Sequence, residues 1–282
     1  MNPVRLCRRP RSGTVVRPIV RAIGESMALS VGRILLLCGI LSSVSQGLFA
    51  QGGPPMLTDD PDTPGSGRWE INAAYTEDRT SDTRQRSFPH VDVNYGLGED
   101  IQLKYETGWV FLSVPNDGTR SGLDDSLVGV KWRFLDQSKV GINMSVYPQL
   151  QFENSTGSVA RGIAPPAPNF LLPFEVSRDF GHFSLVGELG YQFQRSEENQ
   201  WVYGILTGVP VSEDLELLAE VRSFGQEFVS HRDVVLNLGL RKGLGSRCKL
   251  LASVGTGLTN VPNSTSFIAY LGIQLLLGGE KP

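Results

Sequence analysis

The chain has 282 residues, of which 40% are hydrophobic and 20% charged, and its mean hydropathy of −0.10 is close to neutral. A helical membrane protein would need apolar runs of about 20 residues, and none follows residue 50, which excludes that class for the remainder of the chain. Positions 1–50 hold seven of the 26 basic residues and one of the 29 acidic ones; the remainder therefore carries a net charge of −9, which excludes nucleic acid as a partner.

The first fifty residues have the layout of a secretory signal. Arg33 precedes the apolar stretch ILLLCGIL at 34–41, and small residues follow it up to Ala50. A basic flank, a short apolar stretch and small residues before a cleavage point are typical of this export route. We predict a signal peptide over 1–50, with Met27 as an alternative start that would make 1–26 an N-terminal extension.

Residues 51–66 are a Pro-rich segment that we expect to be periplasmic. From Gly67 onward, apolar and polar residues alternate with period two in segments of about the length that a tilted membrane strand needs. In the first segment, Trp69, Ile71 and Ala73 alternate with Glu70, Asn72 and Ala74. Twelve such segments follow in order, at 69–76, 86–95, 101–106, 124–134, 142–151, 168–178, 183–194, 200–210, 214–224, 232–242, 247–257 and 265–277.

Short and long connections alternate between these segments. The short ones lie near 96–99, 135–138, 178–181, 211–213 and 243–246, and the long ones near 79–85, 109–123, 153–167, 195–199, 225–231 and 258–264. Outer-membrane barrels have tight periplasmic turns and longer extracellular loops. We therefore predict an all-β fold for 67–282, a single antiparallel up-and-down transmembrane β-barrel of about 12 strands in the cell outer membrane.

A soluble sandwich or lipocalin-like barrel is the alternative, because it also alternates. Aromatic residues gather at the segment ends, where the two interfacial girdles of a membrane barrel would lie. They are Trp69, Tyr75, Tyr95, Tyr105, Trp109, Trp132, Phe134, Tyr191, Trp201 and Tyr203. This placement and the export signal favour the membrane barrel.

Several stretches resemble a known family of bacterial barrels. They are TDDPDTPGSGRWEINAAYT (58–76), VDVNYGLGEDIQLKYE (91–106), DSLVGVKWRFLDQ (125–137), VYPQLQF (146–152), LPFEVSRDFG (172–181), LELLAEVRS (215–223) and VVLNLGLRKGL (234–244). Together they resemble the MetA-pathway of phenol degradation family of outer-membrane, transporter-like barrel proteins, over roughly 55–277. The resemblance implies a membrane barrel, and its family name links it to aromatic solutes.

The face that alternates with the apolar one is our candidate lumen lining. Its selected members are Glu70, Asn72, Asp92, Gln102, Lys104, Glu106, Lys131, Arg133, Gln149, Glu188, Gln192, Glu220, Arg222 and Arg241. Because both signs of charge occur, pairs such as Lys104–Glu106 or Glu220–Arg222 could instead fill and close the interior, since twelve strands enclose less room than sixteen. The stretch 158–169 is a candidate for a cover or a constriction.

Catalytic and metal signals are weak. His90, His182 and His231 have no zinc-ligand spacing, and the clusters Asp59–Asp60–Asp62 and Asp124–Asp125 have no calcium-loop pattern, so no metal or cofactor is expected. A lipase-like enzyme would need a serine and a histidine in contact. Ser184 follows His182 by two residues but has no recognisable nucleophile motif around it, and we expect no enzyme.

We predict a passive channel for small solutes, without an energy source. The alternative is a closed structural or adhesive barrel that works through loops 109–123 and 153–167. The expected partners are outer-membrane lipid, small-molecule solutes and the outer-membrane insertion machinery.

Overall fold

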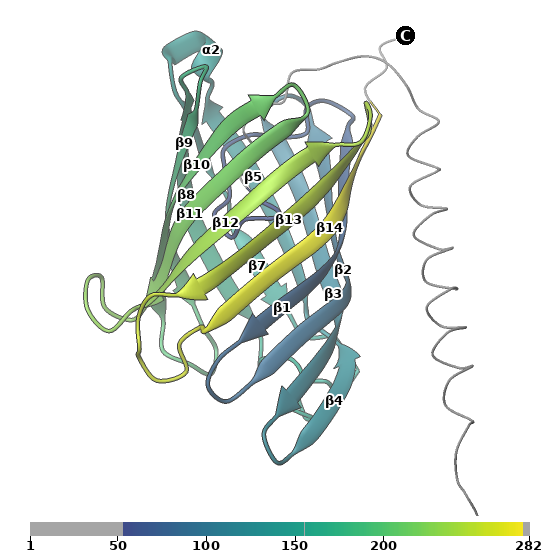
Figure 1. The fold of residues 1–282 in the computed structure, drawn as a ribbon, viewed down its shortest axis with the longest axis vertical. Helices are drawn as coiled ribbons and strands as arrows, with labels where there is room; N and C mark the ends of the chain where they lie inside the picture. The colour runs from purple at the N-terminus through teal and green to yellow at the C-terminus, as the bar shows by residue number, and fades with distance from the viewer. Residues whose placement is uncertain (1–52, 155, 279–282) are drawn as a thin grey trace, which may run out of the picture. The chain divides into compact units, whose positions relative to one another are not determined.

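The computed structural model describes residues 53–154 and 156–278, whose strands form a wall that closes on itself (Figure 1). The strands are β1 (Trp69–Arg79), β2 (Arg84–Leu97), β3 (Ile101–Val114), β4 (Gly118–Leu123), β5 (Ser126–Leu135), β6 (Asn143–Val146), β7 (Gln149–Phe152), β8 (Asn169–Asp179), β9 (Ser184–Phe193), β10 (Gln200–Ser212), β11 (Leu215–Gly225), β12 (Asp233–Gly243), β13 (Cys248–Gly257) and β14 (Phe267–Leu277). One helical turn, α2 (Gln137–Val140), follows β5. The predicted signal peptide lies outside the described residues.

The wall is a closed antiparallel barrel with twelve strand positions. β1 pairs with both β2 and β14, which joins the two ends of the sheet. β4 and β5 follow one another along β3, and β6 and β7 together lie between β5 and β8. Each of these pairs fills one position, so the predicted fold and its twelve strands are confirmed. No helix in the described ranges is both long and apolar enough to span a membrane.

The region 109–123, predicted to be a loop, is mostly strand. β3 continues to Val114, and β4 pairs back onto it from Gly118. The turn between them has positive φ at Asn116 and Gly118, residue types that tolerate this conformation. The prediction was wrong here because β4, with the sequence GTRSGL, has one large apolar residue and therefore no alternating pattern.

The two faces of the wall are reversed relative to a soluble protein. In β8, Phe174 is 52% exposed and Val176 is also exposed, whereas Glu175 between them is 1% exposed. The same reversal recurs around the ring, where the other exposed residues include Leu189, Ile205, Leu217, Leu238, Val254 and Leu271. Because successive side chains of a strand point to opposite faces, the apolar set lies outside and the polar set inside.

The long loop between β7 and β8 folds back onto the wall. Arg161 donates to the carbonyl of Ser121 in β4 at 3.1 Å, and Arg120 donates to the carbonyl of Arg161 at 2.7 Å. The side chains of Ser158 and Ile163 approach the inward side of Gly122. This loop therefore lies against the inner face of β4; that it covers or narrows a pore stays a prediction.

Candidate functional site

The described N-terminal segment, residues 53–65, lies inside the barrel, and we call it the plug. Its prolines at 54, 55, 61 and 64 cannot donate main-chain hydrogen bonds, so it forms no strand. Thr58 in its centre is fully buried. We expected 51–66 to be periplasmic; from residue 53 onward the segment contacts inward-facing wall residues, and the side of the membrane from which it enters stays a prediction.

Carboxylates of the wall accept hydrogen bonds from the main-chain amides of the plug. Glu220 in β11 accepts from the amides of Leu57 and Thr58, both at 2.8 Å. Glu188 in β9 accepts from the amide of Asp59 at 2.9 Å. A buried amide without a partner is costly, and a bond to a carboxylate is stronger than a neutral one. These two acids therefore fix the middle of the plug.

Basic and hydroxyl groups of the wall donate hydrogen bonds to the carbonyls of the plug. Arg241 donates to the carbonyls of Gly53 and Pro54 at 3.1 Å, and Ser253 donates to the carbonyl of Pro55 at 2.8 Å. Arg222 donates to the carbonyl of Leu57. A Pro-rich segment offers carbonyls with few amides, which explains why donors from the wall hold this part of the plug.

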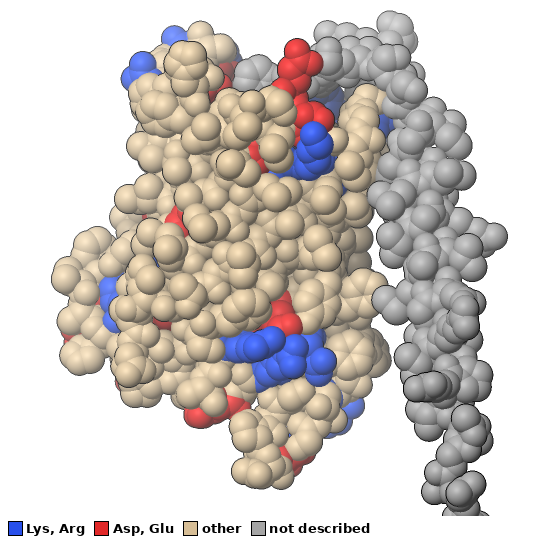
Figure 2. Space-filling model, in the orientation of Figure 1, with Lys and Arg blue, Asp and Glu red and all other residues tan. Residues whose placement is uncertain are grey.

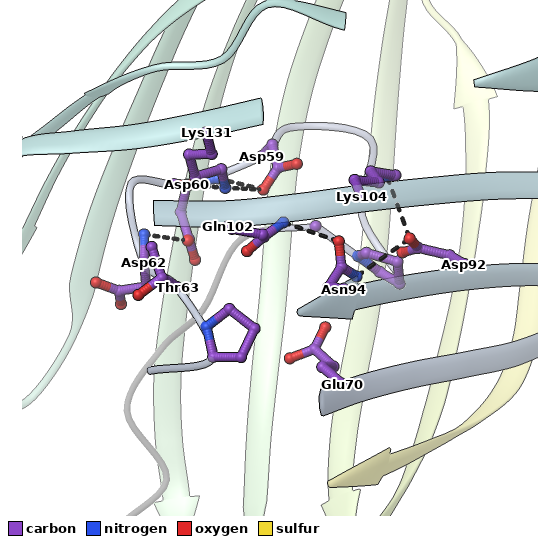
Figure 3. A pocket seen from close by; sticks show the side chains of 13 residues that line it. Asp59, Asp60, Asp62, Thr63, Glu70, Asp92, Asn94, Gln102, Lys104 and Lys131 are labelled. Carbon is purple, nitrogen blue, oxygen red and sulfur yellow. Dashed lines mark hydrogen bonds and ion pairs between the residues drawn. The ribbon is translucent and has the colours of Figure 1, made fainter. Parts of the chain in front are cut away.

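Lys131 in β5 is a cationic contact of the acidic part of the plug. Its ammonium group lies 2.8 Å from Asp59 Oδ1 and 3.6 Å from Glu175 Oε2, and it also donates to the carbonyl of Asp60 (Figure 3). Further along, Arg133 lies 3.5 Å from the carboxylate of Asp62. Two of the three acids of the plug, Asp59 and Asp62, thus pair with a basic side chain of the wall.

The pKa values of Asp59 and Asp60 are shifted in opposite directions. Burial disfavours the charged form of Asp59, but Lys131 and Lys104 outweigh it and lower the pKa of this carboxyl. Burial raises the pKa of Asp60 well above its ordinary value, and the nearby carboxylate of Asp62 raises it further. The position beside Lys131 therefore favours the ionised form of Asp59, whereas burial favours the neutral form of Asp60 relative to an ordinary carboxyl.

Glycines in the wall make room for the plug. Gly204 in β10 lies in register between Arg222 of β11 and Glu188 of β9, which bond to each other over it at 2.8 Å. A Cβ at Gly204 would stand 2.2 Å from the hydroxyl of Thr58, and one at Gly239 would stand 2.7 Å from Met56 Sδ. Met56 itself packs with Val186, Leu206 and Leu218 in a small apolar cluster.

A second polar network lies on the inner side of β1–β3. Lys104 bonds to Glu106 at 2.8 Å and lies 3.6 Å from Asp92, and His90 lies 3.3 Å from Glu106. Between this network and the plug is a polar cavity of about 30 Å³, which is large enough to hold water (Figure 3). Its walls include Asp60, Glu70, Asp92, Gln102, Lys104 and Lys131.

All fourteen predicted lining residues are buried or half-buried. Six contact the plug directly: Lys131, Arg133, Glu188, Glu220, Arg222 and Arg241. Glu70, Asp92, Gln102 and Lys104 border the cavity, and Asn72, Glu106 and Gln192 bond to other wall residues. Gln149 lies half-buried at the start of β7. That these groups line a solute pathway stays a prediction.

The pairing within this set differs in part from expectation. The Lys104–Glu106 pair is present, but Arg222 bonds to Glu188 and not to Glu220. Glu220 instead binds the plug, a contact that sequence reasoning missed. The available signal was indirect: a non-alternating acidic, Pro-rich segment directly before a barrel whose inward positions include glycines.

The residues considered for catalysis do not form a site. Ser184 is buried and its hydroxyl has no partner among the described residues, whereas His182 is exposed in the turn before β9. Within residues 53–154 and 156–278, no group of three or more His, Cys, Asp or Glu side chains is arranged to hold a metal ion.

The fold is shared with outer-membrane channels of known structure. An outer membrane channel from Pseudomonas putida F1 is 12% identical with a TM-score of 0.55, and the match covers 80% of this chain and 100% of that one. The KdgM porin (12% identity, TM-score 0.50) and the NanC porin (9%, 0.51) each match 73% of this chain and 98% of their own. No family model and no curated protein matches the chain.

Proposed function

We propose that the protein is a passive outer-membrane channel for small solutes, and that the plug occupies its pathway in the state described here. The observation that carries the proposal is the reversed barrel, which has an apolar outer face and an inner face with charged groups of both signs. Neighbours of the same fold are porins and channels, and one is a KdgM porin in complex with disordered oligogalacturonate.

The way the plug is bound supports a pathway that opens. Side-chain contacts hold it, and it adds no strand to the wall. Such contacts can be exchanged for water without breaking the sheet. Membership of the MetA-pathway family, export by the general secretory route and aromatic solutes are parts of the proposal that rest on the sequence.

The test is single-channel conductance of the refolded mature chain in a planar lipid bilayer. We expect discrete, reproducible steps, with long closed intervals because the plug is bound inside the barrel. The second candidate, a closed structural barrel, is favoured by the plug and the charge pairs themselves. It would be supported if protein with verified barrel fold and insertion gave no current, including after removal of the plug.

The lining residues provide a separate check. Lys104→Ala leaves Asp92 and Glu106 without their cation, and Arg133→Ala releases Asp62. Both changes should alter step conductance or ion preference by a measurable amount, about twofold, because buried charges act strongly on ions that pass nearby. The matched control is Arg178→Ala, because Arg178 of β8 faces outward; this variant should leave step conductance and ion preference unchanged.

A further inference from the structure

Three arginines gather on the outer face of the barrel, at the end of the wall that carries the longer loops. Arg79 ends β1, and Arg84 and Arg86 begin β2. In the sheet, Arg79 pairs with Arg84 and Glu77 pairs with Arg86. Because these positions share the parity of Trp69, Ile71 and Ala73, their side chains point away from the lumen. Figure 2 shows a compact basic group on this part of the surface, beside one acidic patch.

The charge of this group is only partly balanced. Glu77 bonds to Arg79 and to Arg84, the latter at 2.7 Å, and it is the only acid bonded to the three arginines among the described residues. Arg86 donates a hydrogen bond from a terminal nitrogen to Ser113 Oγ at 3.3 Å, and its buried Nε has no partner within the described ranges. The side chains of Arg79 and Arg84 are 43% and 45% exposed. Arg79, Arg84, Arg86 and Glu77 together carry a net charge of +2, and Asp82 lies in the turn between the two strands.

An apolar row borders the arginines on the membrane side. In the sheet register, Leu271, Tyr75 and Trp109 lie one outward-facing row before Arg86, a step of about 7 Å along the strands. Leu271 and Trp109 are exposed, as is Phe88 in the bulge of β2 between them. Arg79 also lies over the ring of Phe267, 4.8 Å from its centre. Aromatic rings and arginine stems of this kind favour the boundary between hydrocarbon and headgroups.

We propose that Arg79, Arg84 and Arg86 bind the phosphate groups of a lipid headgroup in the leaflet on the long-loop side. Guanidinium groups bind phosphate oxygens in a two-pronged geometry that no headgroup without a phosphate matches. The groups face outward, so a lipid reaches them from the membrane, whereas a solute in the lumen does not. This inference rests on the proposed membrane insertion, but not on an open channel.

The experiment uses the folded full barrel in neutral detergent, titrated with purified lipid A that carries both phosphates or has been dephosphorylated. Native mass spectrometry counts bound lipid. Wild-type protein should bind the phosphorylated form at least about tenfold more tightly, and the triple variant Arg79→Gln/Arg84→Gln/Arg86→Gln should lose this preference. The control is Arg178→Gln, another outward arginine stacked on a phenylalanine ring, and it should keep the preference.

Two measurements keep the test decisive. If the triple variant does not fold, Arg86→Gln alone leaves the bonds from Arg79 and Arg84 to Glu77 intact and should still weaken binding severalfold. Channel conductance of either variant should equal that of the wild type, because the arginines lie outside the lumen; this separates failure of the lipid site from failure of the channel. Equal binding of both lipid forms, or full binding by the folded triple variant, overturns the proposal.

Discussion

Adjacent acids in the plug give a matched pair of substitutions at the scale of single residues. Asp59 pairs with Lys131 at a position that favours its ionised form, and Asp60 holds Lys131 through its main-chain carbonyl while burial favours the neutral form of its own carboxyl. An amide replaces a neutral carboxyl with little change in charge, but it cannot replace a counter-ion. The two positions should therefore respond differently to the same chemical change.

We expect Asp59→Asn to weaken binding of the plug by on the order of 3 kcal/mol, because a buried lysine loses its nearest carboxylate. Asp60→Asn should leave it nearly unchanged. The measurement is the open fraction in single-channel records. Protonated Asp60 favours the bound plug, and this contribution is lost as pH rises through the raised pKa of Asp60. Opening should therefore increase with pH in the wild type, and less so in Asp60→Asn. Equal open fractions for the two variants would contradict the assignment.

Gly204 gives a second prediction, since its lack of a side chain serves both the plug and the wall. Gly204→Val would place atoms against Thr58 and between Arg222 and Glu188. Valine suits a strand, so the barrel should still form. We expect displacement of the plug, seen as a higher open fraction and faster proteolysis of the N-terminal segment. Gly187→Val, on the outward face of β9, is the control; a plug that stays protected in Gly204→Val would contradict this packing.

At the scale of elements, the period-two alternation was sufficient to predict the strands of the wall but not the plug inside it. Each wall strand repeats an apolar outer and a polar inner position, so the segments at 168–178 and 200–210 fell close to β8 and β10. The plug has no such periodic pattern, because the side chains that bind its main chain come from five different strands. Alternation shows which face of a strand a residue occupies, so the inward residues were identified. It does not show which residue of another strand lies beside it, so pairs such as Arg222–Glu188 were not predicted.

Deletion of residues 53–65 tests the plug as an element. The wall does not use these residues for strand pairing, so the shortened chain should fold and insert. We expect a larger step conductance and fewer closures. A synthetic peptide of sequence 53–65, added to the side of the short turns, should restore the closures, and the same peptide with Asp59 replaced by Asn should do so less well. Unchanged conductance after deletion would show that wall side chains close the lumen by themselves.

For the whole molecule, the reversed distribution of polar and apolar groups determines the surroundings that the barrel needs and the charges that a pathway through it would present. The exposed apolar band needs a lipid environment, while the inner face keeps its charges apart from lipid. Among the fourteen lining candidates, five are basic and five acidic: Lys104, Lys131, Arg133, Arg222 and Arg241 against Glu70, Asp92, Glu106, Glu188 and Glu220. Selective pores use rings of one sign, which this interior lacks.

The open pathway should therefore discriminate weakly between ions. In the variant without residues 53–65, we expect a potassium-to-chloride permeability ratio within about threefold of unity, measured as the reversal potential across a salt gradient. Lys104→Glu together with Arg133→Glu should shift this ratio toward potassium, because both substitutions reverse charges that face inward. The outward Arg178→Glu should not shift it. Strong preference for one sign in the parent variant would mean that a cluster such as Lys131, Arg222 and Arg241 dominates the pathway once the plug has left.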